Sequence, residues 1–61
     1  MENSYWYAVE RDADDNDWGT GSHDYDTAVE IAKKYGPKAQ IAVIEEGTDP
    51  ICVEVIAYKD F

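Results

Sequence analysis

The sequence predicts a small single-domain α+β fold with the order ββαββ, in which a mostly antiparallel four-stranded sheet carries one helix on one face. Three observations predict it. Apolar residues alternate near the start of the chain, they recur at helical spacing in the middle, and two apolar runs with a short connection lie near the end. Sixty-one residues allow one domain, 1–61, with no linker and no second domain.

The first hairpin is predicted from residues 4–22. The segment SYWYAVER alternates aromatic and β-branched residues with smaller or polar ones, which is typical of a strand. The run DADDND follows, and its aspartates and asparagine favour a turn. We interpret WGTGS, residues 18–22, as a short second strand that pairs with the first. An irregular loop is the alternative, because two glycines weaken a strand.

The helix is predicted over residues 25–35. Asp24 suits the N-cap position, and two lysines in the last turn oppose the negative end of the helix dipole. Gly36 suits the left-handed position after the helix, and Pro37 then prevents its continuation. The apolar positions follow the i, i+3, i+4, i+7 spacing of an amphipathic helix: Tyr25, Ala28, Val29, Ile31, Ala32 and Tyr35.

The last two strands are predicted from AQIAVIEE and ICVEVIAY, which the segment GTDP joins as an antiparallel hairpin. One helix covers only one face of the resulting sheet. By simple alternation we expect Val53 and Val55 on the covered face, and Trp6, Ile44 and Ile56 on the uncovered one. An exposed apolar face usually marks an interface, so we expect it to contact a protein partner or a second copy in a homodimer.

The charge excludes several classes of partner. Fourteen acidic residues against five basic ones give a net charge of −9, which opposes direct nucleic-acid binding and attachment to an anionic membrane. We expect a cytoplasmic protein. The first residues lack the basic and apolar regions of a signal peptide, no apolar run is long enough to span a membrane, and the chain has one cysteine.

The acidic segment DADDNDWGTGSHD raises the question of a metal site. Asp12, Asp14 and Asn16 match the first three ligand positions of an EF-hand loop. Asp17 then stands where glycine makes the sharp turn, and His23 stands where a glutamate closes the site. We therefore predict no metal site and no cofactor, with weak non-specific binding of divalent cations as the alternative. We also expect the crowded carboxylates to raise one another's pKa, so that stability increases from neutral pH toward about 5.

Catalysis is not predicted, and no catalytic residue is assigned. The chain has one histidine, His23, and one cysteine, Cys52. They would be paired as nucleophile and base only because no other candidates exist, and no motif or spacing indicates such a pair. Cys52 lies in an apolar strand run, where we expect it to be a small core residue.

The function predicted from these observations is a protein–protein interaction module that acts without catalysis on a partner of unknown identity, with a basic protein as one candidate. Tryptophan is enriched at binding hot spots, and acids beside it suit a basic partner. The alternative is an acidic nucleic-acid mimic of the phage or mobile-element type, which inhibits a nucleic-acid-binding protein. We expect two interaction surfaces, one formed by Trp18, Asp14, Asp15 and Asp17, and one formed by Trp6, Ile44 and Ile56.

Overall fold

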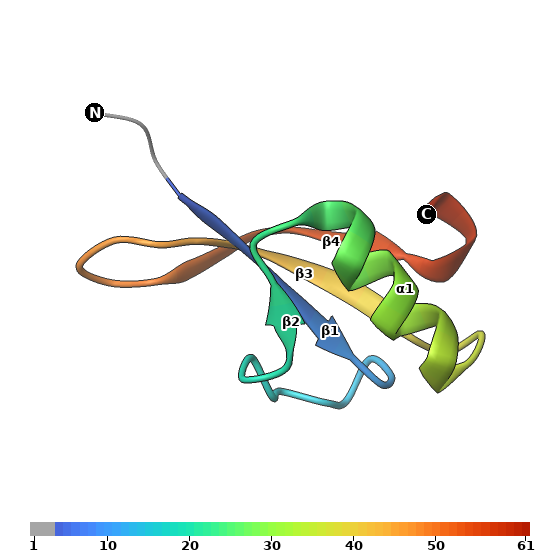
Figure 1. Ribbon diagram of the computed structural model, residues 1–61. Helices are drawn as coiled ribbons and strands as arrows, with labels where there is room; N and C mark the ends of the chain where they lie inside the picture. The colour runs from blue at the N-terminus through green and yellow to red at the C-terminus, as the bar shows by residue number, and fades with distance from the viewer. Residues whose placement is uncertain (1–3) are drawn as a thin grey trace.

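The computed structural model describes residues 4–61 and confirms the ββαββ order (Figure 1). Its sheet has four antiparallel strands in the order β2-β1-β3-β4, so that β1 and β3 are central. The elements are β1 (Tyr5–Glu10), β2 (Gly21–Ser22), α1 (Tyr25–Tyr35), β3 (Gln40–Glu45), β4 (Ile51–Ala57) and the short 3-10 helix η1 (Tyr58–Asp60).

The main core lies between α1 and the central strands. Val9 of β1 pairs with Ile41 of β3, and both side chains are almost fully buried on the helix side of the sheet. Ala28 and Ala32 of α1 are fully buried against them, because small side chains allow the helix to approach the sheet closely. Aromatic side chains surround this core: Tyr7, Tyr25, Tyr58 and Phe61.

The helix has the predicted bounds, although the Asp24 side chain accepts no hydrogen bond from a backbone N–H of the first turn. Asp24 is the N-cap residue with an extended backbone, and its Oδ2 accepts a hydrogen bond of 2.8 Å from Thr27 Oγ1. Its backbone N–H donates to Ser22 Oγ, which fixes the turn that leads into the helix. At the other end Gly36 adopts a φ of +116° and donates its backbone N–H to the Ala32 carbonyl.

The second strand is shorter than predicted. β2 consists of Gly21 and Ser22 alone, so Trp18 lies outside it, although the Val9 N–H still donates to the Thr20 carbonyl at 2.8 Å. Gly21 is essential to this pairing. Its φ is +154°, and a Cβ there would lie 2.1 Å from the Tyr7 carbonyl oxygen. The two backbones approach closely because no side chain separates them.

The pairing of β3 with β4 contains a β-bulge. Val43 lies opposite Glu54, whereas the next residue of β3, Ile44, lies opposite Cys52. Val53 is therefore the extra residue on β4, and the alternation of side chains between the two faces changes at this point.

The bulge corrects the prediction of which β4 residues face the helix. Ile56 lies opposite Ile41 and packs against the core on the helix side, whereas it was expected on the uncovered face. Val55 lies opposite the buried Ala42 of the other face, whereas it was expected under the helix. Simple alternation assigned Val55 and Ile56 to the wrong faces because it does not allow for the extra residue, Val53, at the bulge.

β4 is an edge strand, and none of its seven residues is buried. α1 packs mainly on β1, β2 and β3, and makes few contacts with β4. Cys52 is exposed, so the expectation of a small core cysteine is wrong. Ile51, Val53 and Val55 are each about half exposed.

Candidate functional site: a hollow lined by two tryptophans

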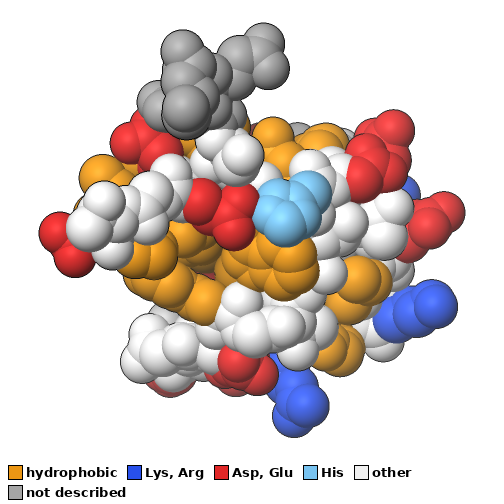
Figure 2. Space-filling model, turned by 60° about the vertical axis from the view of Figure 1, so that its left-hand side comes forward, with side chains coloured by type: hydrophobic (Ala, Val, Ile, Leu, Met, Phe, Trp, Pro, Cys, Tyr) orange, Lys and Arg blue, Asp and Glu red, His pale blue; other side chains and the backbone are white. Residues whose placement is uncertain are grey.

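A hollow of about 370 Å³ lies near the first half of β1, on the face away from the helix. Figure 2 shows hydrophobic side chains gathered around a hollowed region, with the histidine and acidic side chains beside it. The residues that line the hollow come from β1, β3 and three connecting segments: Trp6, Trp18, His23, Ile44, Glu46 and Pro50.

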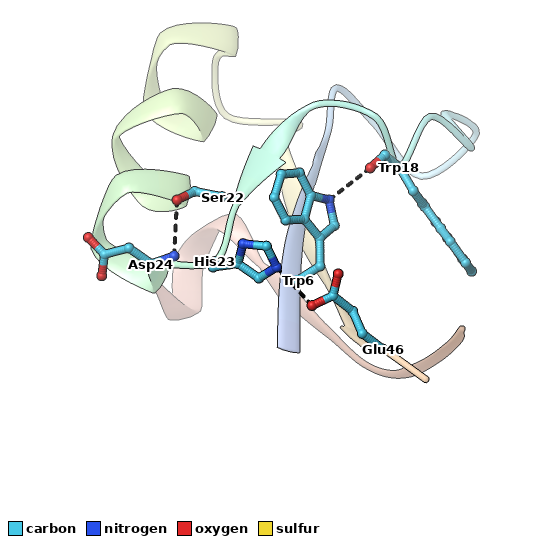
Figure 3. Close-up of polar contacts among 6 residues, drawn as sticks. All are labelled: Trp6, Trp18, Ser22, His23, Asp24 and Glu46. Carbon is cyan, nitrogen blue, oxygen red and sulfur yellow. Dashed lines mark hydrogen bonds and ion pairs between the residues drawn. The ribbon is translucent and has the colours of Figure 1, made fainter. Parts of the chain in front are cut away.

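Trp6 holds the site together. Its position in β1 places its side chain opposite that of Ile44, away from α1. The indole Nε1–H donates a hydrogen bond of 2.8 Å to the Trp18 carbonyl, and the ring meets His23 edge-on with 4.8 Å between centroids. Figure 3 shows the Trp6 ring between His23 and Trp18. The indole thus positions the Trp18 backbone beside the first strand.

His23 and Glu46 form the polar part of the rim. His23 Nε2 lies 2.8 Å from Glu46 Oε1, and both side chains are solvent-accessible (Figure 3). Glu46 follows β3 directly, and its backbone N–H donates to the Ser4 carbonyl at 2.9 Å. This bond continues the pairing of β1 with β3 by one residue and holds the carboxylate beside the aromatic rings.

Ile44 forms the buried wall of the hollow. It is 2% exposed and packs with Ala8, Ala42 and Trp6 in a second cluster on the face away from the helix. The predicted surface of Trp6, Ile44 and Ile56 is therefore corrected. Ile44 is covered within the single chain, and Ile56 lies on the opposite side of the sheet.

Trp18 supplies the accessible aromatic surface of the hollow. It is 38% exposed, although its backbone is fixed by the bond from Trp6. A large aromatic side chain with few rotatable bonds loses little entropy when a partner covers it, and tryptophan is enriched at binding hot spots.

The acidic residues before Trp18 form hydrogen bonds within their own loop. Asp12 Oδ1 accepts from the Asp14 N–H, and Asp17 Oδ1 accepts from the Gly19 N–H. Asp15 accepts two bonds, from the N–H groups of Arg11 and Asp17. The carboxylates therefore stabilise a series of turns, in which each satisfies a backbone donor two residues later or four residues earlier.

These hydrogen bonds lower the pKa of Asp15 below its usual value. The largest cause is the N–H of Arg11, followed by that of Asp17, because both bonds favour the charged carboxylate. The expectation that crowding raises the pKa values is thus wrong for Asp15, whose pKa is lowered mainly by the backbone hydrogen bonds that its carboxylate accepts.

The structure also groups the predicted site residues differently. Asp14, Asp15 and Asp17 line a separate depression with Arg11, whereas Trp18 lines the hollow with Trp6 and Ile44. Sequence reasoning missed His23, Glu46 and Pro50 as neighbours of the tryptophans. The only local signal for Glu46 was its position as the last residue of the predicted strand AQIAVIEE.

The arrangement of the metal-ligating and nucleophilic residue types can be described for residues 4–61. No group of three or more His, Cys, Asp and Glu residues in residues 4–61 is arranged to hold a metal ion. His23 pairs with Glu46, and the Cys52 thiol donates to the Glu54 carbonyl, so neither contacts the other in a nucleophile–base pair. Within the same residues no helix has the length and apolar character needed to cross a membrane.

Comparison with protein-family models gave no match, and neither the curated proteins nor the solved structures gave one.

Proposed function

We propose that this protein is a non-catalytic protein-binding module that accommodates a basic side chain of its partner in the tryptophan hollow. The observation that supports this most directly is the meeting of Trp6 and Trp18, from segments twelve residues apart, around one solvent-open hollow. Binding pockets are mostly apolar with a few convergent polar groups, and here Glu46 and His23 are those groups.

The preference for a basic side chain follows from charge. The chain has a net charge of −9, and the Glu46 carboxylate lies on the rim of the hollow. An arginine or lysine would place its apolar stem against the tryptophans and its charge over their faces or near Glu46. The chain already makes one contact of this kind, because the Arg11 guanidinium lies 5.4 Å from the centre of the Tyr35 ring.

The test is a titration followed through the two indole N–H signals in NMR spectra. The probes are short unstructured peptides in which an arginine or lysine stands between apolar residues, and matched peptides with glutamate instead. We expect the basic peptides to shift the indole signals and the acidic peptides to leave them unchanged. Shifts by neither class at millimolar peptide would contradict the proposal.

Variants separate the hollow from general charge attraction. Trp18→Ala removes the accessible wall and should weaken binding at least tenfold, a size typical of a hot-spot residue. Tyr35→Ala removes an aromatic residue of similar exposure, 41% against 38%, from the helix and should leave binding unchanged.

The same titration distinguishes nucleic-acid mimicry, in which carboxylates replace phosphates. Asp14→Asn and Asp17→Asn remove charge, and asparagine at position 17 keeps the oxygen that accepts from Gly19. Nucleic-acid mimicry predicts that binding weakens in these two variants, depends steeply on salt and is retained in Trp18→Ala. That result would contradict binding in the tryptophan hollow and favour the mimic.

A further inference from the structure

β4 presents an unpaired edge. In the part of the chain that the structure describes, β4 pairs with β3 along one side, and its other side leaves backbone N–H and C=O groups without a strand partner. Natural proteins protect such edges with short strands, charges, prolines or bulges. β4 is seven residues long, and its protection consists of one charge, Glu54, and the bulge at Val53.

Apolar side chains flank this edge on both faces of the sheet. Ile51, Val53 and Val55 are 52%, 49% and 51% exposed, which is unusual for three β-branched residues on one strand. On the helix side, Val53 and Ile56 border a depression of about 380 Å³, which has room for side chains from an added strand.

We propose that β4 pairs antiparallel with β4 of a second copy of this chain, so that two four-stranded sheets join into one. The two backbones would satisfy each other's unpaired groups, and the exposed β-branched side chains would cover one another on both faces. This surface is separate from the tryptophan hollow, and the proposal does not depend on the proposed function.

Charge favours a second copy at this edge over a basic partner. Two chains that each carry −9 repel, so they are expected to meet where charge is lowest. Ile51–Ala57 contains one acidic residue and no basic one. On this strand a basic partner would meet a single carboxylate, that of Glu54, so little charge would attract it to the edge.

The size of the chain also favours self-association. A 61-residue domain buries only about 60% of the surface that its unfolded chain exposes, and such small domains often gain stability from disulfides, metals or association. One cysteine cannot form an intramolecular disulfide. No metal-holding group occurs among residues 4–61, so close packing and self-association are the sources of stability considered for this chain.

The topology limits the assembly to two copies. The opposite edge of the sheet is β2, which has two residues, so β4 is the one long edge within the described chain. Pairing of β4 with β4 uses the same surface twice and closes as a symmetric dimer. The register should avoid placing Glu54 directly opposite its copy, because facing like charges destabilise a strand pair.

Sedimentation velocity from low to high micromolar concentration tests the proposal. We expect a shift from monomer to dimer in the micromolar range, because an edge contact of seven residues falls among the small, weak interfaces. Added salt should strengthen the dimer by screening the repulsion between the two chains. A wild-type chain that stays monomeric throughout, or one that forms species larger than a dimer, would overturn the proposal.

A pair of lysine variants identifies the surface. Val55→Lys places a charge on the exposed edge and should weaken the dimer at least tenfold, although it lowers the net negative charge of each copy. Tyr35→Lys makes the same charge change at a half-exposed position in α1 and should leave the dimer intact. A dimer that persists in Val55→Lys, or one that Tyr35→Lys weakens equally, would exclude β4 as the interface.

Amide hydrogen exchange provides a readout that does not depend on a variant. In wild-type protein the outward N–H groups of β4 should exchange more slowly as concentration rises, whereas those of β1 should not change. Exchange at β4 that is independent of concentration while a dimer forms would place the interface elsewhere.

Discussion

The two strands of the second hairpin have similar compositions and opposite burial. β3 reads QIAVIE and has four consecutive buried residues, whereas β4 reads ICVEVIA and has none. β3 has a neighbour on each side and the helix above it; β4 has one neighbour and little of the helix. The difference teaches that apolar composition predicts a strand, whereas position in the sheet decides which strand becomes core.

The largest expected effect comes from shortening an isoleucine in each strand. Ile41→Ala in β3 removes a side chain that is fully buried under α1 and should destabilise the protein by about 2–5 kcal/mol. Ile51→Ala in β4 removes a half-exposed one and should cost less than about 1 kcal/mol. Urea denaturation at low micromolar protein measures the free energy of unfolding of both variants. Equal losses of stability would contradict the conclusion that β3 forms the core and β4 does not.

A smaller effect is expected from the strand that gives β1 its second neighbour. Gly21→Ala would place a Cβ against the Tyr7 carbonyl and force β2 away from β1, at a cost of about 2 kcal/mol. β1 would then resemble β4 in having one paired side. Gly47→Ala in the hairpin loop is the control, because a Cβ there meets nothing within 4 Å. Similar denaturation midpoints for the two variants would show that β2 contributes little.

The smallest expected effect concerns pH and the loop between β1 and β2. Because the pKa of Asp15 is lowered in the folded protein from its usual 3.8, its ionised form stabilises the fold above that value. This contribution is lost as pH falls from about 4 through the lower folded value. Asp15→Asn should therefore lose less stability than wild type on acidification below pH about 4.

Urea midpoints measured between neutral pH and strong acid follow this difference. Asp49→Asn, in the loop between β3 and β4, removes the same charge and is the control. Identical acid profiles for wild type and Asp15→Asn would show that the loop's hydrogen bonds to Asp15 do not contribute to the pH dependence.

Much of the fold follows from local signals in the sequence. The helix was predictable because its cap at Asp24, its apolar spacing and its end at Gly36 all agree. The faces of β1 and β3 were predictable because neither strand departs from simple alternation where the two pair. This alone placed Trp6 and Ile44 on one side of the sheet, away from the helix.

The remaining features depend on pairing, which composition does not determine. The sequence ICVEVIA gives no sign of the bulge at Val53, so Val55 and Ile56 were each predicted on the wrong face of the sheet. The exposure of Cys52 follows from the edge position of β4, which depends on strand order. Similarly, Glu46 reaches the tryptophans only because β3 ends beside the start of β1.

The turns of the acidic loop have a consequence for how this sequence can change over time. An asparagine offers the same side-chain oxygen as an aspartate, so the bonds that Asp12 and Asp17 accept from the backbone require a carbonyl oxygen and not a charge. Selection for the fold therefore constrains the spacing of these residues, while their charge can drift or be selected separately. The acidity of the protein can evolve with its partners while the path of the chain stays the same.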